Sequence, residues 1–98
     1  MKPFPVLQKI ALNELGSRIS QARRVREMTQ TDLARAADLG LSTVVDLEAG
    51  KPGVSVGALA KVMETLGLLA QLDEVLDPHK DPRFTEQAIR KLPQRARG

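Results

Sequence analysis

The sequence predicts an all-α fold, a five-helix domain preceded by an N-terminal arm and followed by a basic C-terminal tail. Three observations lead to this class. Apolar residues recur at helical spacing along most of the chain, and capping residues or glycines stand where each periodic segment starts or stops. The 98 residues suffice for one hydrophobic core. Because the chain contains no cysteine, disulfide frameworks and thiolate chemistry are excluded.

Residues 1–12 are predicted to form an arm, because two early prolines oppose a helix there. The first helix is predicted to begin at Asn13, a good N-cap residue, and to run to about Glu27. Gly16 lies within it and is expected to allow another element to pack closely. The apolar residues at helical spacing face inward: Leu15, Ile19 and Ala22.

The second and third helices are predicted to be joined by a tight turn at residues 38–40. Thr29 should cap the second helix, with Asp32 reaching back as a weaker form of the capping box. The third helix should run from Leu41 to Ala49, and Gly50 should end it in a left-handed conformation. The predicted buried positions are Leu33, Ala34, Ala37, Val44 and Leu47. Two helices crossing over a short turn is the geometry that places the second one in the DNA major groove.

The last predicted segments are a fourth helix, a leucine-rich fifth segment and a polar tail. Ser55 should cap the fourth helix, which ends at Gly67. The spacing of the leucines in the fifth segment suits a helix, whereas the alternation of apolar residues would also suit a strand. Its apolar residues are predicted either to form a dimer interface or to close the monomer core: Leu68, Leu69, Leu72, Val75 and Leu76. The tail, residues 77–98, carries one possible short helix at residues 85–92.

Composition narrows the classes of partner. Residues 1–77 hold nine Lys or Arg and ten Asp or Glu, whereas residues 78–98 hold six against two. This basic tail suggests contact with nucleic acid or an acidic protein surface, with a solvated end as the alternative. Two aromatic residues are too few for stacking on single-stranded bases. No segment approaches the ~20 apolar residues of a membrane span, so we expect a soluble cytoplasmic protein with no membrane association.

One pattern of residues resembles a known family. Arg23, Gln30, and the run LARAADLGLSTVVDLEAGK over residues 33–51 are similar to the helix-turn-helix domain of Cro and lambda-type repressors, the xenobiotic-response-element (XRE) family. The resemblance covers residues 13–76 and implies a lambda-repressor-like domain that binds double-stranded DNA. A finer resemblance is to HipB-like antitoxins, and it rests on three stretches: the N-terminal MKPFPVLQKIALNELGSRI, the run GVSVGALAKVMETLGLLAQLDEVLDP and the ending KLPQR.

The resemblance implies roles for individual residues. Gln30 would place its amide on a DNA phosphate, where a helix N-terminus favours an anion. Arg23 and Glu48 would form a structural ion pair that ties the first helix to the third. The other positions that the resemblance or their charge assigns to DNA contact are Thr31, Leu41, Ser42, Thr43, Asp46, Lys51, Arg18 and Arg35, with Arg24 a further possible phosphate contact.

The predicted recognition helix, residues 41–49, departs from the usual chemistry of base readout. Its exposed face should present Leu41, Ser42, Val45, Asp46 and Ala49. It contains no Arg, Lys, Asn or Gln, the residues that make the strongest base contacts. A serine can donate or accept, an acid can accept from a cytosine amino group, and a leucine can contact a thymine methyl. Direct readout should therefore be modest, with specificity coming from DNA shape and dimer spacing.

These features favour two compatible functions. One is a homodimeric repressor on a pseudo-palindromic operator. The other is a HipB-like antitoxin of a type II toxin-antitoxin system, which autoregulates its operon and neutralises a HipA-like Ser/Thr kinase. A restriction-modification controller or phage-type repressor without a toxin partner is the alternative. Because no catalytic arrangement, metal-ligand cluster or phosphate loop stands in the sequence, no enzymatic activity, metal or cofactor is expected.

Overall fold

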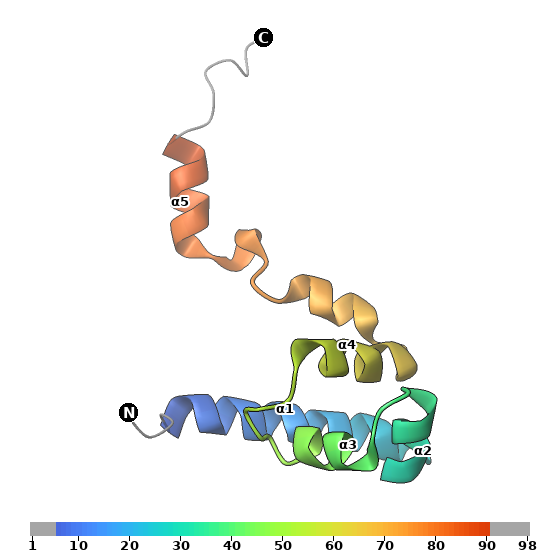
Figure 1. The fold of residues 1–98 in the computed structure, drawn as a ribbon. Coiled ribbons are helices and arrows are strands. Elements are labelled where there is room, and N and C mark those ends of the chain that lie inside the picture. The colour runs from blue at the N-terminus through green and yellow to red at the C-terminus, as the bar shows by residue number, and fades with distance from the viewer. Residues whose placement is uncertain (1–5, 91–98) are drawn as a thin grey trace.

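The computed structural model describes residues 6–90, and this part of the chain folds into helices (Figure 1). The all-α class is confirmed. In chain order the elements are α1 (Val6–Val25), α2 (Gln30–Ala36), α3 (Leu41–Glu48), α4 (Val56–Thr65), the 3-10 helices η1 (Leu69–Glu74) and η2 (Pro78–Lys80), and α5 (Pro82–Arg90). Among these described elements, none combines the length and the apolar character that crossing a membrane requires.

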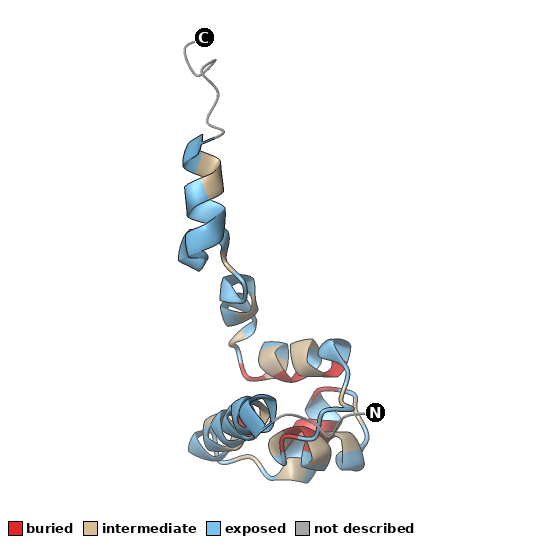
Figure 2. Cartoon of the chain, turned by 90° about the vertical axis from the view of Figure 1, so that its left-hand side faces the viewer, coloured by how far each residue is buried: buried red, intermediate tan, exposed pale blue. Residues whose placement is uncertain are grey.

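The hydrophobic core lies where α1 to α4 meet. Leu33, Val44 and Val62 are fully buried, one from each of α2, α3 and α4, and Ile19 of α1 joins them. The buried positions predicted in the second and third helices are confirmed. Figure 2 shows the buried residues gathered in this compact part of the chain and the ascending C-terminal segment exposed. The four helices thus supply the buried residues of the core.

The local signals around the second and third helices are confirmed. The Thr29 hydroxyl accepts a hydrogen bond from the Asp32 backbone N–H at 3.0 Å, and the Asp32 carboxylate accepts one from the Thr29 N–H at 2.9 Å. These bonds hold the pKa of Asp32 below its ordinary value. Asp38 in the turn has φ 58° and Gly50 after α3 has φ 76°, both left-handed. The capping box and the two left-handed residues therefore set the ends of α2 and α3.

The predicted start of the first helix at Asn13 is wrong. Helix α1 begins at Val6, so residues 6–12 are helical, and residues 1–5 of the predicted arm lie outside the described part. No helix-breaking residue stands between Val6 and Asn13, and proline is tolerated just before or at a helix start. Asn13 instead packs against Gly50, where an added Cβ would lie 2.5 Å from the Asn13 Oδ1 and 2.8 Å from its Cα. Asn13 therefore lies inside α1 and contacts Gly50, and it does not cap the helix.

The leucine-rich fifth segment is neither an α-helix nor a strand. It forms the 3-10 helix η1, which lies against α4. Leu68 packs against the core and Leu72 is half-buried, so part of the segment closes the monomer. Leu69, Val75 and Leu76 remain exposed, by 40%, 61% and 92%. Leu68 and Leu72 therefore fit the alternative that the segment closes the monomer core, while a dimer interface at the exposed residues stays a prediction.

The C-terminal helix α5 begins at Pro82, three residues before the predicted start, and Leu92 lies outside the described part. Contacts in the described part join α5 to η2. No residue of α5 is buried (Figure 2). Phe84 and Ile89 are exposed by 50% and 65%. The helix therefore presents apolar side chains that the rest of the described chain leaves uncovered.

Candidate nucleic-acid interface

The contact between α1 and α3 depends on Gly16. A Cβ at this position would lie 2.7 Å from the backbone oxygen of Leu47 and closer still to that of Glu48. Because real Cβ atoms essentially never approach backbone so closely, a side chain here would force the two helices apart. Gly16 thus allows the C-terminal half of α3 to lie directly on α1, and the expectation of close packing is confirmed.

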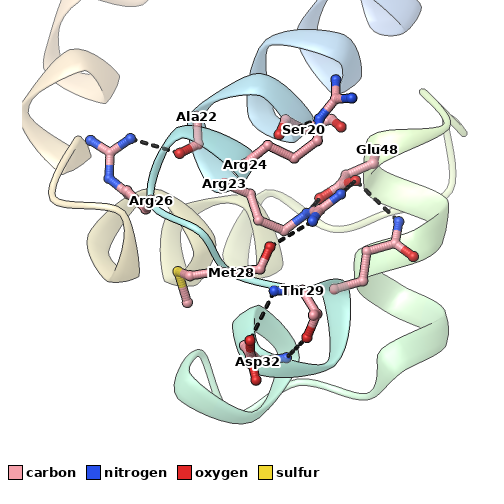
Figure 3. Close-up of polar contacts among 10 residues, drawn as sticks. Ser20, Ala22, Arg23, Arg24, Arg26, Met28, Thr29, Asp32 and Glu48 are labelled. Atoms are coloured by element: carbon pink, nitrogen blue, oxygen red, sulfur yellow. Dashed lines mark hydrogen bonds and ion pairs between the residues drawn. The ribbon is translucent and has the colours of Figure 1, made fainter.

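Arg23 and Glu48 form a bidentate ion pair at this crossing (Figure 3). The Arg23 Nε donates to Glu48 Oε2 at 2.7 Å and its Nη2 donates to Oε1 at 3.0 Å. The remaining Nη1 donates to the backbone oxygen of Met28 at 2.7 Å. The two side chains are 11% and 6% exposed. This arrangement ties α1, the loop after it and α3 together at one point.

Gln30 joins the same network, a contact that the sequence did not reveal. Its Nε2 donates to Glu48 Oε1 at 3.0 Å, so α2 is tied to the crossing as well. Burial alone would raise the pKa of Glu48, but the hydrogen bonds from Arg23 and Gln30, with the Arg23 charge, outweigh it and lower that pKa. The hydrogen bond to Glu48 likewise raises the pKa of Arg23 above its ordinary value. Both groups are therefore held in their charged forms.

The outward side of α3 is partly exposed and largely apolar. Val44 and Leu47 face the core, as predicted. On the opposite side Leu41 and Val45 are exposed by 47% and 40%, and Ser42 and Ala49 are exposed beside them. These four residues belong to the face that the sequence predicts for DNA contact. A helix so anchored by one side presents the other as a rigid surface.

Asp46 is half-buried with a side chain that is 41% exposed, and its Oδ1 lies 3.4 Å from the Lys51 Nζ. The Asp46 backbone oxygen also accepts from the Lys51 N–H at 3.0 Å. Thr43, half-buried too, lines a surface hollow with Asp46 and the loop from Lys51 to Ser55. The Lys51 charge offsets the negative charge of Asp46, which alone would repel DNA phosphates.

The polar residues of α2 divide between two sides. Gln30 is half-buried and faces Glu48, while Thr31 and Arg35 are exposed. Thr31 and Arg35 stand four residues apart and so share one helix face. The structure therefore gives Gln30 an internal role that the sequence did not indicate, and one hydrogen of its amide remains available to a ligand.

The arginines of α1 separate around the helix. Arg18 lines a hollow with Leu59, Met63 and other residues of the α4 side, away from the predicted DNA-contact residues. Arg24 instead lines a shallow hollow where α1, α2 and α3 meet, together with Ser17, Ser20, Gln30 and Val45. Its Nε donates to the Ser20 backbone oxygen at 3.3 Å, which orients it (Figure 3). The spacing of Ser17, Ser20 and Arg24 on one helix face is the signal that could have identified this group.

Comparison with known proteins adds two findings. The family model described as "Helix-turn-helix domain" matches residues 14–76. A relative from Sinorhizobium fredii (strain NBRC 101917 / NGR234), named an uncharacterized HTH-type transcriptional regulator, y4mF, is 39% identical over 54 residues, which are 55% of this chain and 71% of the relative. No solved structure matches the chain.

Proposed function

The chain belongs to the XRE family of helix-turn-helix DNA-binding transcriptional regulators, and on that premise we propose that it is a repressor that binds a pseudo-palindromic operator as a homodimer. The observation that carries the proposal is the geometry of α3. Its inner side is held by Gly16 and by the Arg23–Glu48 pair, while its outer side is left open. A rigid helix presented in this way fits the major groove.

Residues around α3 supply groups for phosphate contact. Arg24, Thr31 and Arg35 are exposed on the helices that flank it, and the Lys51 side chain is 64% exposed at its end. Gln30 keeps one amide hydrogen for a phosphate while the other holds Glu48. Phosphate contacts of this kind set the register of the protein on DNA, whereas base contacts set specificity. Arg18 is the weakest of the proposed contacts, because it lies on the α4 side of α1.

The exposed leucines and valine after α4 support the homodimer. Leu69, Val75 and Leu76 are apolar, exposed and close together in sequence. A surface of this kind is covered when two copies meet. Two copies of the domain would then present two α3 helices to half-sites about 34 Å apart, one turn of DNA.

A partner protein is the second part of the proposal. We propose that the chain is a HipB-like antitoxin that holds a HipA-like Ser/Thr kinase inactive, with operator binding as autoregulation. Helix α5 supports this role, since Phe84 and Ile89 are exposed and the helix has no buried residue. Such a helix is suited to docking on another protein. The helix-turn-helix family is generally non-enzymatic, and we assign no catalytic role.

The test is a salt-dependent titration of the full chain with the promoter upstream of its own gene and with random duplex. We expect tight promoter binding, much weaker random binding and a fall of log K with log salt. Gln30→Ala should weaken promoter binding, whereas Gln8→Ala, an exposed glutamine in the first turns of α1, should not. Equal weak binding to both duplexes would contradict the repressor. The antitoxin role is tested by co-purifying the chain with the product of a kinase gene beside its own. Failure of that kinase to co-purify would contradict this role.

A further inference from the structure

We propose that the outward face of α3 reads the 5-methyl groups of thymines, so that each operator half-site is defined by A·T pairs presenting those methyls in the major groove. This inference rests on the proposed DNA-binding function. The surface concerned is an apolar ridge formed by Leu41, Val45 and Ala49.

The three residues of this ridge are spaced four residues apart. Leu41 and Val45 belong to α3, and Ala49 is its C-cap residue. Side chains four residues apart on a helix are neighbours, with about 6 Å of axial rise between them. Stacked base pairs are about 3.4 Å apart. With α3 lying along the groove, Leu41 and Val45 therefore meet bases about two steps apart. A ridge of this spacing can cover two methyl groups of one half-site.

The polar groups of α3 are mostly committed elsewhere. Glu48 is held by Arg23 and Gln30, at 2.7 to 3.0 Å. The Asp46 Oδ1 lies 3.4 Å from the Lys51 Nζ, although the Asp46 side chain is 41% exposed. The described helix contains no Arg, Lys, Asn or Gln. Ser42 is the exposed polar side chain that remains beside the ridge, and one hydroxyl reads any base pair weakly.

The ridge is also accessible to a ligand. Leu41 and Val45 are 47% and 40% exposed, although α3 is packed tightly on its other side. Val45 and Ala49 line the shallow hollow where α1, α2 and α3 meet, together with Gln30 and Arg24. The apolar face is therefore continuous with the proposed phosphate contacts. Apolar side chains in the major groove find one apolar group on the bases, the thymine methyl.

The experiment uses a duplex from the promoter of the chain's own gene, to which the full chain binds. Thymine is replaced by deoxyuridine at one position at a time, and the binding affinity of the full chain is measured for each duplex. Each replacement removes a methyl group and leaves base pairing and the hydrogen-bonding edges intact. Removing a buried methyl should weaken binding about fourfold per contact. We expect this loss at two or more positions in each half-site.

Two variants connect the effect to the ridge. In Leu41→Ala and Val45→Ala the thymine-to-deoxyuridine penalty should shrink at one position each, because the apolar contact is already lost. Val6→Ala, an exposed valine in the first turn of α1, should keep the full penalty. Thermal unfolding of each variant checks that folding is retained.

The outcomes separate this inference from the function on which it rests. Specific promoter binding with less than a twofold response to deoxyuridine at every position overturns the methyl-reading ridge and leaves the repressor intact. A penalty that persists unchanged in both ridge variants also overturns it. No preference for the promoter over random duplex overturns both.

Discussion

Replacing Arg23 by methionine should cost the domain about 3 kcal/mol of unfolding free energy. The variant keeps most of the apolar stem but removes three hydrogen bonds, two to Glu48 and one to Met28. It leaves Glu48, whose side chain is 6% exposed, with an unpaired carboxylate. Losing one partner of a buried pair costs about 3–5 kcal/mol. The lower end applies here because Gln30 still donates to Glu48.

The loss is large beside the about 5–15 kcal/mol that stabilises an ordinary domain. At 4–8 °C per kcal/mol for a domain of this size, the melting temperature should fall by roughly 12–24 °C. Urea denaturation followed by circular dichroism measures the free energy directly. Arg26→Met is the matched control: Arg26 is exposed and donates one bond to the Ala22 backbone oxygen at 2.7 Å, so its loss should stay within about 0.5 kcal/mol.

The double variant Arg23→Met, Glu48→Met completes the cycle. Because two apolar side chains leave no unpaired charge, it should be more stable than Arg23→Met alone. A loss of less than about 1 kcal/mol in Arg23→Met, or costs that simply add in the double variant, would refute the reasoning.

Three further predictions follow from the same region. Gly16→Ala should destabilise the domain by about 1–3 kcal/mol in thermal unfolding, since its Cβ would press on backbone oxygens of α3; Gly57→Ala, whose Cβ meets nothing closer than 3.8 Å, should not. Acid should destabilise the domain: the folded-state pKa of Glu48 lies below its ordinary 4.5, so the stability it contributes is complete above that pH and is lost as the pH falls through the folded value. In Arg23→Met this part of the acid response should disappear. Thr29→Ala should cost about 1 kcal/mol by chemical denaturation, through loss of the capping box.

Each of these has a contradicting result. Equal melting temperatures for Gly16→Ala and Gly57→Ala would mean that α3 shifts away from α1 without cost. An acid midpoint that is unchanged in Arg23→Met would remove Glu48 from the pH response. Full stability of Thr29→Ala would mean that solvent satisfies the first turn of α2 equally well.

Much of the fold could be predicted from the sequence, because its signals act over a few residues. The capping box at Thr29 and Asp32, the turn at Asp38 and the buried positions of α2 and α3 depend on neighbours within a turn or two. The start of α1 is not predictable in this way, because Asn13 is a good N-cap residue and residues 1–12 contain no Ser, Thr, Asp or Asn. The actual partner of Asn13, Gly50, is distant in sequence.

The candidate site was only partly predictable for the same reason. The exposed face of α3 followed from helical spacing, and the Arg23–Glu48 pair followed from family resemblance. The pairing of Asp46 with Lys51 and the separation of Arg18 from Arg24 did not. A charged side chain has several partners within reach of its sequence position, and the angle between helices decides which one it meets.

The sequence by itself determined where the helices of the domain turn and end, and which face of each is apolar, since capping and periodicity are local. The tertiary structure alone decided how closely α1 and α3 approach at Gly16 and that Gln30 completes the network on Glu48. It also decided that the apolar ridge of α3 stays open. These outcomes depend on packing between segments far apart in the chain, where distances of a few tenths of an ångström separate a contact from a clash.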